Sequence, residues 1–241
     1  MLDWLRRDPS KAPTLDLGGR ALPIVVRRLD RARRMTMRLA SDGSEVRISI
    51  PRWGRTADAL AFAEARREWL ASQLAAVPAA AQVRPGASLS FRGAHLRLRH
   101  EPGSRRKPTI SGETLLAGGA EASLEPRIRR WLQAEALALL AEDLAHYCRL
   151  AGREPPRIAL SNARRRWGSC AANGSIRINW RLIMAPDMVR RSVVAHEVAH
   201  LLHFDHSPAF HACLAGLFEG DVAQANDWLR REGRGLYRLF G

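Results

Sequence analysis

The chain has 241 residues, of which 46% are hydrophobic, so it is long and apolar enough to fold as one large globular domain or two small ones. Its 39 lysine and arginine residues outnumber its 24 aspartate and glutamate residues and give a formal net charge of +15, with lysine only at Lys11 and Lys107. This charge favours polyanionic partners such as nucleic acid or nucleotide phosphate, although the same arginine-rich composition is typical of GC-rich genomes.

The number and spacing of the cysteines, and the lengths of the apolar stretches, indicate the cellular compartment of the protein. Cys148, Cys170 and Cys213 are odd in number and widely spaced, which argues against a disulfide framework and favours a reducing environment. No stretch approaches the roughly 20 apolar residues that a membrane-spanning helix needs, and the start of the chain lacks an apolar run of signal-peptide length. We therefore expect a cytoplasmic protein with no membrane partner.

The first half of the chain predicts a mobile arm followed by a β-rich domain. Residues 1–19 are polar, contain Pro9 and Pro13 and end in two glycines, which is typical of an arm. A domain over residues 20–118 is predicted to hold one helix, from Thr56 to about Ala76, because apolar residues recur there at helical spacing. Strands are expected at 22–28, 35–39, 46–50, 88–91, 94–99, 109–110 and 114–116. The paired glycines at 118–119 mark the predicted domain boundary.

Residues 119–241 predict a second domain that is mainly helical. A long amphipathic helix is expected over 122–150, and strands over 157–160 and 176–180, with residues 167–174 as the turn between them. Three shorter helices follow, of which Pro186 and Asp187 open the first. Together with the first half, this pattern predicts the α+β fold class.

The segment His196-Glu197-Val198-Ala199-His200 lies in the first of these three helices. Residues four apart share one face of a helix, so His196 and His200 can present two ring nitrogens to one metal ion. Glu197 lies one step round the helix, where it can reach a water on that ion and act as a general base. The alternative is a chance match with structural histidines, but a buried helix carrying three such side chains needs partners for them.

A catalytic zinc site usually has three protein ligands and one open position, so a third ligand is required. His206 is the first candidate, because Ser207 and Pro208 predict a new helix cap, which ends the preceding helix near Phe204 and leaves His206 in the connection. Glu219 is the second candidate, and the nearby rivals are His203, Asp205 and His211.

Four segments carry a family resemblance: Arg-Trp-Gly-Ser-Cys at 166–170, Gly-Ser-Ile-Arg-Ile-Asn-Trp-Arg-Leu-Ile at 174–183, the histidine helix, and His-Ser-Pro-Ala-Phe at 206–210. They resemble the YgjP-like family of zinc metallopeptidases and, more widely, the SprT-like and WLM proteases, which place a third histidine soon after HExxH. The resemblance is dense over residues 160–212 and looser back to about residue 25. His211 departs from it, because the family often has an aromatic residue there.

The resemblance implies a β-hairpin-rich N-terminal part with a helix, and a zincin-like domain over 119–241 with a small sheet and the HExxH helix. It implies a zinc metallohydrolase with one Zn2+ per chain, held by His196, His200 and His206, that cleaves polypeptides with water activated by Glu197. In zinc proteases of this shape an edge strand before the helix pairs with extended substrate. The substrate-binding residues predicted on this basis are Arg166, Ile176, Arg177, Ile178 and Asn179.

The chemistry of peptide hydrolysis also requires a donor for the developing oxyanion, and Arg166, Asn179 and His203 are the candidates. Two other functions stay open. Some YgjP-like proteins are assigned as UTP pyrophosphatases, and the positive charge suits a triphosphate, but the sequence has no Walker-type glycine loop or acidic cluster for Mg2+. A nucleic-acid-binding protein with structural zinc is the other, although a structural site needs no base such as Glu197.

Overall fold

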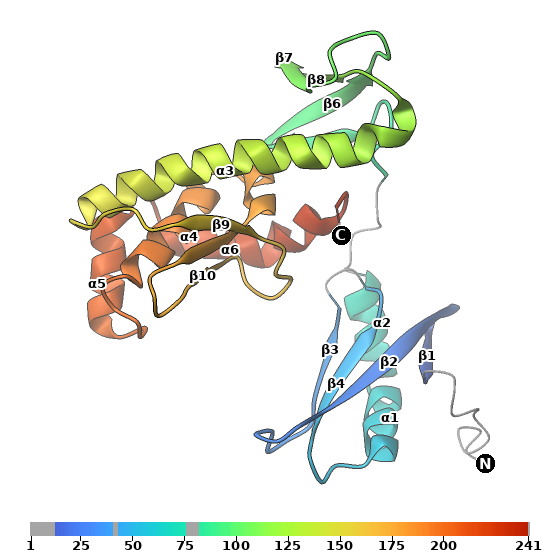
Figure 1. Ribbon diagram of the computed structural model, residues 1–241. Coiled ribbons are helices and arrows are strands. Elements are labelled where there is room, and N and C mark those ends of the chain that lie inside the picture. Colours follow the sequence, from blue (N-terminus) through green and yellow to red (C-terminus); the bar gives the residue numbers. More distant parts are fainter. Residues whose placement is uncertain (1–12, 41–42, 76–81, 241) are drawn as a thin grey trace. The chain divides into compact units, whose positions relative to one another are not determined.

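The computed structural model describes residues 13–40, 43–75 and 82–240, and the chain folds as two compact units, residues 1–79 and 80–241 (Figure 1). Both units combine helices with small sheets, so the α+β class predicted from the sequence is confirmed. None of the helices in the described ranges is long and apolar enough to cross a bilayer.

The first unit is a four-stranded sheet with two helices. Strands β1 (Thr14–Leu17), β2 (Arg20–Leu29), β3 (Thr36–Leu39) and β4 (Val46–Pro51) lie in the order β1-β2-β4-β3, with β3 and β4 antiparallel as the predicted hairpin requires. Their alternating apolar residues pack with helices α1 (Thr56–Ala65) and α2 (Arg67–Ala75) in a core of their own. The single helix predicted over 56–76 is therefore two helices, which meet at Arg66.

The mobile arm predicted over residues 1–19 is wrong for residues 14–17. These residues form β1, which pairs antiparallel with β2. Leu15 and Leu17 point into the core and are only 3% and 5% exposed, which anchors the strand. Gly18 and Gly19, with positive φ angles of 67° and 88°, make the turn into β2. Residues 1–12 of the predicted arm lie outside the described residues.

The second unit begins with another four-stranded sheet. Strands β5 (Ser88–Phe91), β6 (Ala94–His100), β7 (Thr109–Ser111) and β8 (Thr114–Ala117) lie in the order β5-β6-β8-β7, and a 3-10 turn (Glu121–Ser123) leads into the long helix α3 (Leu124–Leu150). Apolar side chains of this sheet share one core with the N-terminal half of α3. The boundary predicted at 118–119 therefore falls inside this unit, because the sheet and α3 bury their apolar faces against each other.

A three-stranded sheet and three helices complete the second unit. Strands β9 (Ile158–Ser161), β10 (Gly168–Cys170) and β11 (Ile176–Asn179) lie in the order β10-β11-β9, and a 3-10 segment (Trp180–Met184) precedes α4 (Asp187–Ala199). Helices α5 (Pro208–Leu217) and α6 (Val222–Glu232) and a 3-10 turn (Gly233–Tyr237) follow. Helix α4 packs against α3, α5, α6 and β10, so it is the central helix of the unit (Figure 1).

Candidate metal centre

Helix α4 ends earlier than the sequence predicts, and its end positions the second histidine. It stops at Ala199 rather than near Phe204, and His200 caps it in a helical conformation. The next backbone bonds tighten to the i to i−3 pattern, with the N–H of Leu201 donating to the Val198 carbonyl at 2.9 Å. The chain can therefore turn back within a few residues of His200.

The connection between α4 and α5 brings the third histidine to the same place. Ser207 caps α5, since its hydroxyl accepts a hydrogen bond from the Phe210 N–H, and Pro208 occupies the first turn, as predicted. One ring nitrogen from each of His196, His200 and His206 lies within 4.8 Å of the others. The two Nε2 atoms of His196 and His206 are 3.3 Å apart. Three imidazoles from two helix ends thus converge on one point.

The spacing and orientation of these rings fit a metal ion. Two nitrogens about 2.0–2.1 Å from a tetrahedral Zn2+ are about 3.3 Å from each other, which is the separation between His196 and His206. Nδ1 of His200 lies 3.0 Å from the carbonyl oxygen of His203, so it can donate its proton there and leave Nε2 for the metal. Burial, followed by the nearby histidines, lowers the pKa of His196 to about 4, so its ring is neutral at pH 7, as a ligand must be.

Phe210 packs beneath all three histidines. Its ring centroid lies 4.9 Å from that of His196, 4.6 Å from His200 and 4.8 Å from His206, and its side chain is fully buried. The His211 ring centroid is 6.5 Å from that of His206, and His211 does not belong to the cluster. The aromatic packing under the site therefore comes from Phe210, one position before the residue that departs from the family pattern.

Glu219, the rival third ligand, lies in a different group of side chains. Its Oε2 accepts a hydrogen bond from the Tyr147 hydroxyl at 2.8 Å, and the carboxylate forms an ion pair with Arg191. Within the described part of the chain, the cluster of potential ligands contains none of the other rivals, His203 and Asp205 included.

Glu197 is buried beside a strand whose close approach requires glycine. Its side chain is only 5% exposed, and burial raises its pKa to about 7 against the opposing effects of a Cys170 backbone hydrogen bond and the Arg166 charge. A Cβ atom at Gly168 would lie 2.3 Å from Glu197 Oε1, so no larger residue fits there without displacing the carboxylate. Strand β10 therefore fixes this side chain against α4.

The sequence of residues 33–232 matches the model of a family described as YgjP-like, metallopeptidase domain. The chain belongs to the YgjP-like family. No curated protein and no solved structure matches it. Membership supports a metallopeptidase-type hydrolase and implies a bound metal, for which the three converging histidines are the candidate ligands.

The edge strand predicted at 176–179 of this YgjP-like chain is wrong. Strand β11 is the central strand, antiparallel to β10 and parallel to β9, because the chain forms a short strand where a turn was predicted. The free edge next to Glu197 belongs to β10. The Trp167 carbonyl accepts a hydrogen bond from the Asn179 N–H, and the Ala171 N–H donates to the Ser175 carbonyl. In an antiparallel pair, alternate residues direct their backbone groups at the partner strand, so those of Gly168 and Cys170 face away from β11.

The predicted substrate-binding residues separate into buried and exposed groups. Ile176, Ile178 and Asn179 are fully buried. The Asn179 amide donates to the Ala163 carbonyl and the Tyr237 hydroxyl, both at 2.9 Å, so it has no donor left for an oxyanion. Arg177 is exposed, and Arg166 is exposed and close enough to Glu197 to lower its pKa.

Three features of the site were missed from the sequence: strand β10, the contact of Gly168 with Glu197, and the position of Phe210 beneath the histidines. One signal was available, because an isolated glycine in an otherwise regular segment often marks a close approach of the backbone to another group.

Proposed function

We propose that the protein is a zinc-dependent peptidase in which His196, His200 and His206 hold one zinc ion per chain and Glu197 is the general base. The observation that carries this proposal is the convergence of three ring nitrogens within 4.8 Å beside a buried carboxylate that has no counter-ion at hydrogen-bond distance in the described structure. Three protein ligands, with no fourth in the cluster among the described residues, leave the open position that a catalytic site needs and a structural site closes.

A zinc ion held by the three histidines would supply a Lewis acid for the substrate carbonyl and would lower the pKa of a water molecule to about 7. Glu197 accepts the proton of the attacking water and transfers it to the leaving nitrogen of the peptide. Burial raises its pKa to about 7 despite the Cys170 backbone hydrogen bond and the Arg166 charge, and a further positive charge from a bound metal would favour the ionised form that can accept a proton. The Cys170 backbone hydrogen bond holds the carboxylate in place for both transfers.

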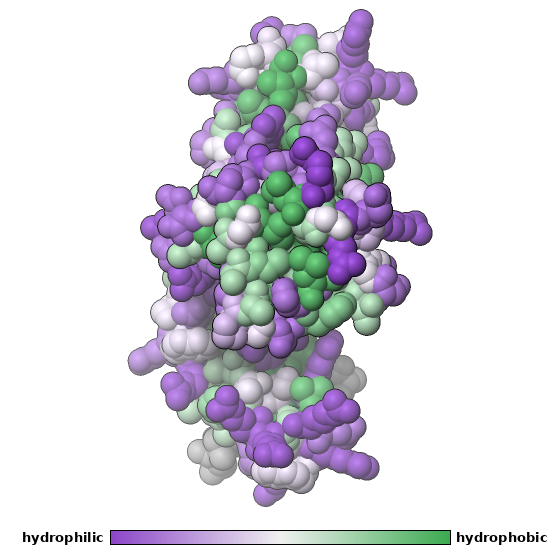
Figure 2. Space-filling model, turned by 90° about the vertical axis from the view of Figure 1, so that its left-hand side faces the viewer, coloured by the Kyte–Doolittle hydropathy of each residue, from purple (hydrophilic) through white to green (hydrophobic). Residues whose placement is uncertain are grey.

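The polypeptide substrate binds as an extra strand along the open edge of β10. The Gly168 backbone and the Cys170 carbonyl face that edge, while the Cys170 N–H binds Glu197, so a peptide paired with β10 passes directly beside the base. Backbone hydrogen bonds do not depend on the side chains of the substrate, so this mode of binding has little sequence preference. Apolar side chains gather on the end of the unit where α5 lies (Figure 2), and Phe204, between the ligands His200 and His206, is 62% exposed. These surfaces favour apolar residues near the cleaved bond.

Arg166 is the donor that we assign to the oxyanion. Of the three candidates, Asn179 is saturated by protein partners, and the His203 carbonyl already binds His200. Arg166 is exposed, and its charge acts on Glu197. A guanidinium in this place can stabilise negative charge that develops on the substrate oxygen.

A second candidate function is nucleotide pyrophosphohydrolysis, with UTP as the test substrate. The observation that favours it is the run of exposed arginines at 164–166, which leads directly into Trp167 and β10 and places positive charge near Glu197. Phosphate oxygens would bind these guanidinium groups. The peptidase remains the better supported function because an open strand edge lies beside the base.

Parallel assays separate the two functions. Purified protein with one equivalent of zinc would be incubated with an unfolded casein-like protein and, separately, with UTP, each beside the Glu197→Gln variant. The peptidase proposal expects cleavage of the protein substrate that disappears in the variant. Turnover of UTP alone, again lost in the variant, would replace it with the pyrophosphohydrolase, and equal activity of wild type and variant on both substrates would overturn both.

A further inference from the structure

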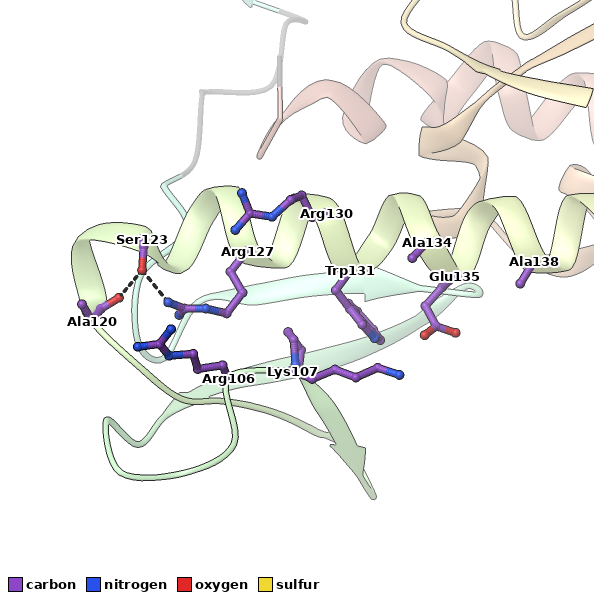
Figure 3. Close-up of a pocket in the computed structure, with 11 residues that line it drawn as sticks. Arg106, Lys107, Ala120, Ser123, Arg127, Arg130, Trp131, Ala134, Glu135 and Ala138 are labelled. Atoms are coloured by element: carbon purple, nitrogen blue, oxygen red, sulfur yellow. Dashed lines mark hydrogen bonds between the residues drawn. The ribbon is translucent and has the colours of Figure 1, made fainter.

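A second site with a different chemistry lies on the N-terminal half of α3. A pocket of about 650 Å3 opens between α3 and the loop that joins β6 to β7 (Figure 3). Figure 1 shows this part of α3 at the opposite end of the helix from α5, which carries Phe210 beneath the histidines. The side chains that define this basic pocket are Arg106, Lys107, Arg127, Arg130, Trp131 and Glu135.

Positive charge dominates the pocket. Four of its lining side chains are cationic, and Glu135 is the only acidic one. Among the described residues, Arg106, Lys107 and Arg130 form no ion pair or side-chain hydrogen bond. Four cations beside a single carboxylate repel one another, and this repulsion is relieved when an anion binds between them. The charge of the pocket is therefore complementary to a polyanionic group.

Two of the arginines are held close together. Arg127 donates to the Gly118 carbonyl at 2.5 Å and to the Ser123 hydroxyl, so its guanidinium is fixed at the start of α3. A Cβ atom at Gly119 would lie 2.9 Å from Arg127 Nη2 and 3.6 Å from Arg106 Cγ, which places both side chains around that glycine. Figure 3 shows the two guanidinium groups side by side at one end of the pocket. Paired guanidinium groups present several N–H donors, which suits phosphate oxygens.

The other end of the pocket combines a rigid apolar ring with the Lys107 and Glu135 side chains (Figure 3). Trp131 is only 7% exposed and stacks on Phe91 with ring centroids 5.1 Å apart, so its position is fixed. Ala134 and Ala138 extend this wall along α3, and Glu135 projects beside it (Figure 3). Such a wall can contact a ring or sugar, and the carboxylate can accept a hydrogen bond from a hydroxyl or amino group.

We infer that the basic pocket binds a small phosphorylated molecule with the chemistry of a nucleoside phosphate. Its phosphates lie between Arg106 and Arg127, and its ring and sugar lie along Trp131, where Lys107 and Glu135 can bind its polar groups. The volume of the pocket falls in the range of about 300–1,000 Å3 that is typical of small-molecule sites, which favours a single nucleotide over a polymer. This inference does not depend on the peptidase proposal, because the pocket shares no residue with the metal centre.

Calorimetric titration of the full-length protein with ATP, UTP and inorganic triphosphate tests the inference. The Glu197→Gln protein serves as the parent so that no probe is hydrolysed, and Arg106→Ala and Lys107→Ala are made on it. The matched control is Arg153→Ala. Arg153 is an exposed arginine of the same unit that lies outside the pocket, so this variant also loses one positive charge. Thermal unfolding of each variant checks that it is folded.

We expect saturable binding of the two nucleotides, weaker binding of triphosphate, and a Kd raised at least tenfold by Arg106→Ala and by Lys107→Ala. Arg153→Ala should stay within twofold of the parent. Absence of saturable binding, or equal losses in all three variants, would overturn the inference. A single-stranded oligonucleotide that binds more tightly than ATP and loses as much affinity with Arg106→Ala would also overturn it, because the site would then be one for a polymer.

Discussion

On one side of α4 the charged side chains form ion pairs with one another and with α3, and on the other side three histidines converge without a carboxylate partner. Arg190 is 3% exposed and donates to Asp143 at 2.7 Å and to Asp187 in its own helix, while Arg191 pairs with Glu219. One ring nitrogen of each histidine instead lies close to those of the other two, and none of the three rings pairs with a carboxylate in the described structure. The paired side is complete without a ligand, whereas the converging nitrogens of the histidine side are placed to bind a cation.

We infer from this difference that the ion-paired residues stabilise the fold, and that the histidines and Glu197 are the candidates for metal binding and catalysis. The same difference explains why Glu219, which the sequence allows as a ligand, belongs to the structural side: Tyr147 and Arg191 already satisfy its carboxylate. Substitutions on the paired side should therefore change the free energy of unfolding, and substitutions on the histidine side should change metal content or turnover.

The largest expected effect is that of Glu197→Gln. The amide keeps the size of the side chain but cannot accept a proton, so kcat should fall about 10²–10⁴-fold, as is usual when a general base is removed. Zinc content, measured by plasma mass spectrometry, should stay at one per chain. Glu219→Gln, which removes a carboxylate of the paired side, is the matched control and should keep both activity and zinc.

Arg190→Ala should be the most destabilising change on the paired side. It leaves the buried Asp143 with only the more distant Arg191, at 4.0 Å, and breaking a buried pair in this way costs about 3–5 kcal/mol. Urea unfolding followed by circular dichroism would measure the loss, with the exposed pair Arg230 and Asp227 as a reference through Arg230→Ala. A loss for Arg190→Ala no larger than that for Arg230→Ala would contradict the structural role of the pair.

Gly168→Ala should lower turnover at least tenfold, an effect worth about 1.4 kcal/mol or more. The added Cβ would meet Oε1 of Glu197 at 2.3 Å and displace the base while leaving the histidines in place. Gly216→Ala in α5 is the control, because a Cβ there meets nothing within 4 Å. If both variants turn over substrate at the wild-type rate, the close approach of β10 to Glu197 has no bearing on catalysis.

The smallest expected effect is on the free energy of unfolding at low pH. Burial raises the pKa of Asp187, but the hydrogen bond from Arg92 and the charge of Arg190 outweigh it, so the pKa lies below its usual value. A carboxylate with a folded-state pKa below that of the unfolded state adds stability above about pH 4, and this is lost as pH falls through the folded-state pKa. Unfolding titrations from pH 6 to pH 3 should show a shallower loss for Asp187→Asn than for wild type. Parallel curves would exclude this contribution.

Local signals in the sequence were enough to predict which three histidines converge. The spacing of His196 and His200 follows from helix geometry, and the Ser207-Pro208 cap predicts where the chain turns back toward them. These features depend on a few adjacent residues, so they can be read without knowing how distant segments pack. The same holds for the long helix predicted at 122–150 and found at Leu124–Leu150.

Features that depend on distant pairing could not be predicted in the same way. The central position of β11 follows from its parallel pairing with β9, and the extent of the second unit follows from the burial of the β5–β8 sheet on α3. Neither pairing leaves a local pattern of residues. The contact of Gly168 with Glu197 likewise joins β10 to α4, segments that only the folded chain brings together.

Zinc content after substitution of each histidine tests the central claim most directly. Wild-type protein should carry one zinc per chain, while His196→Ala, His200→Ala and His206→Ala should each bind it at least a hundredfold more weakly. His211→Ala and Glu219→Gln should match wild type. Retention of tightly bound zinc by all three histidine variants, or its loss in Glu219→Gln, would show that these three rings are not the ligands.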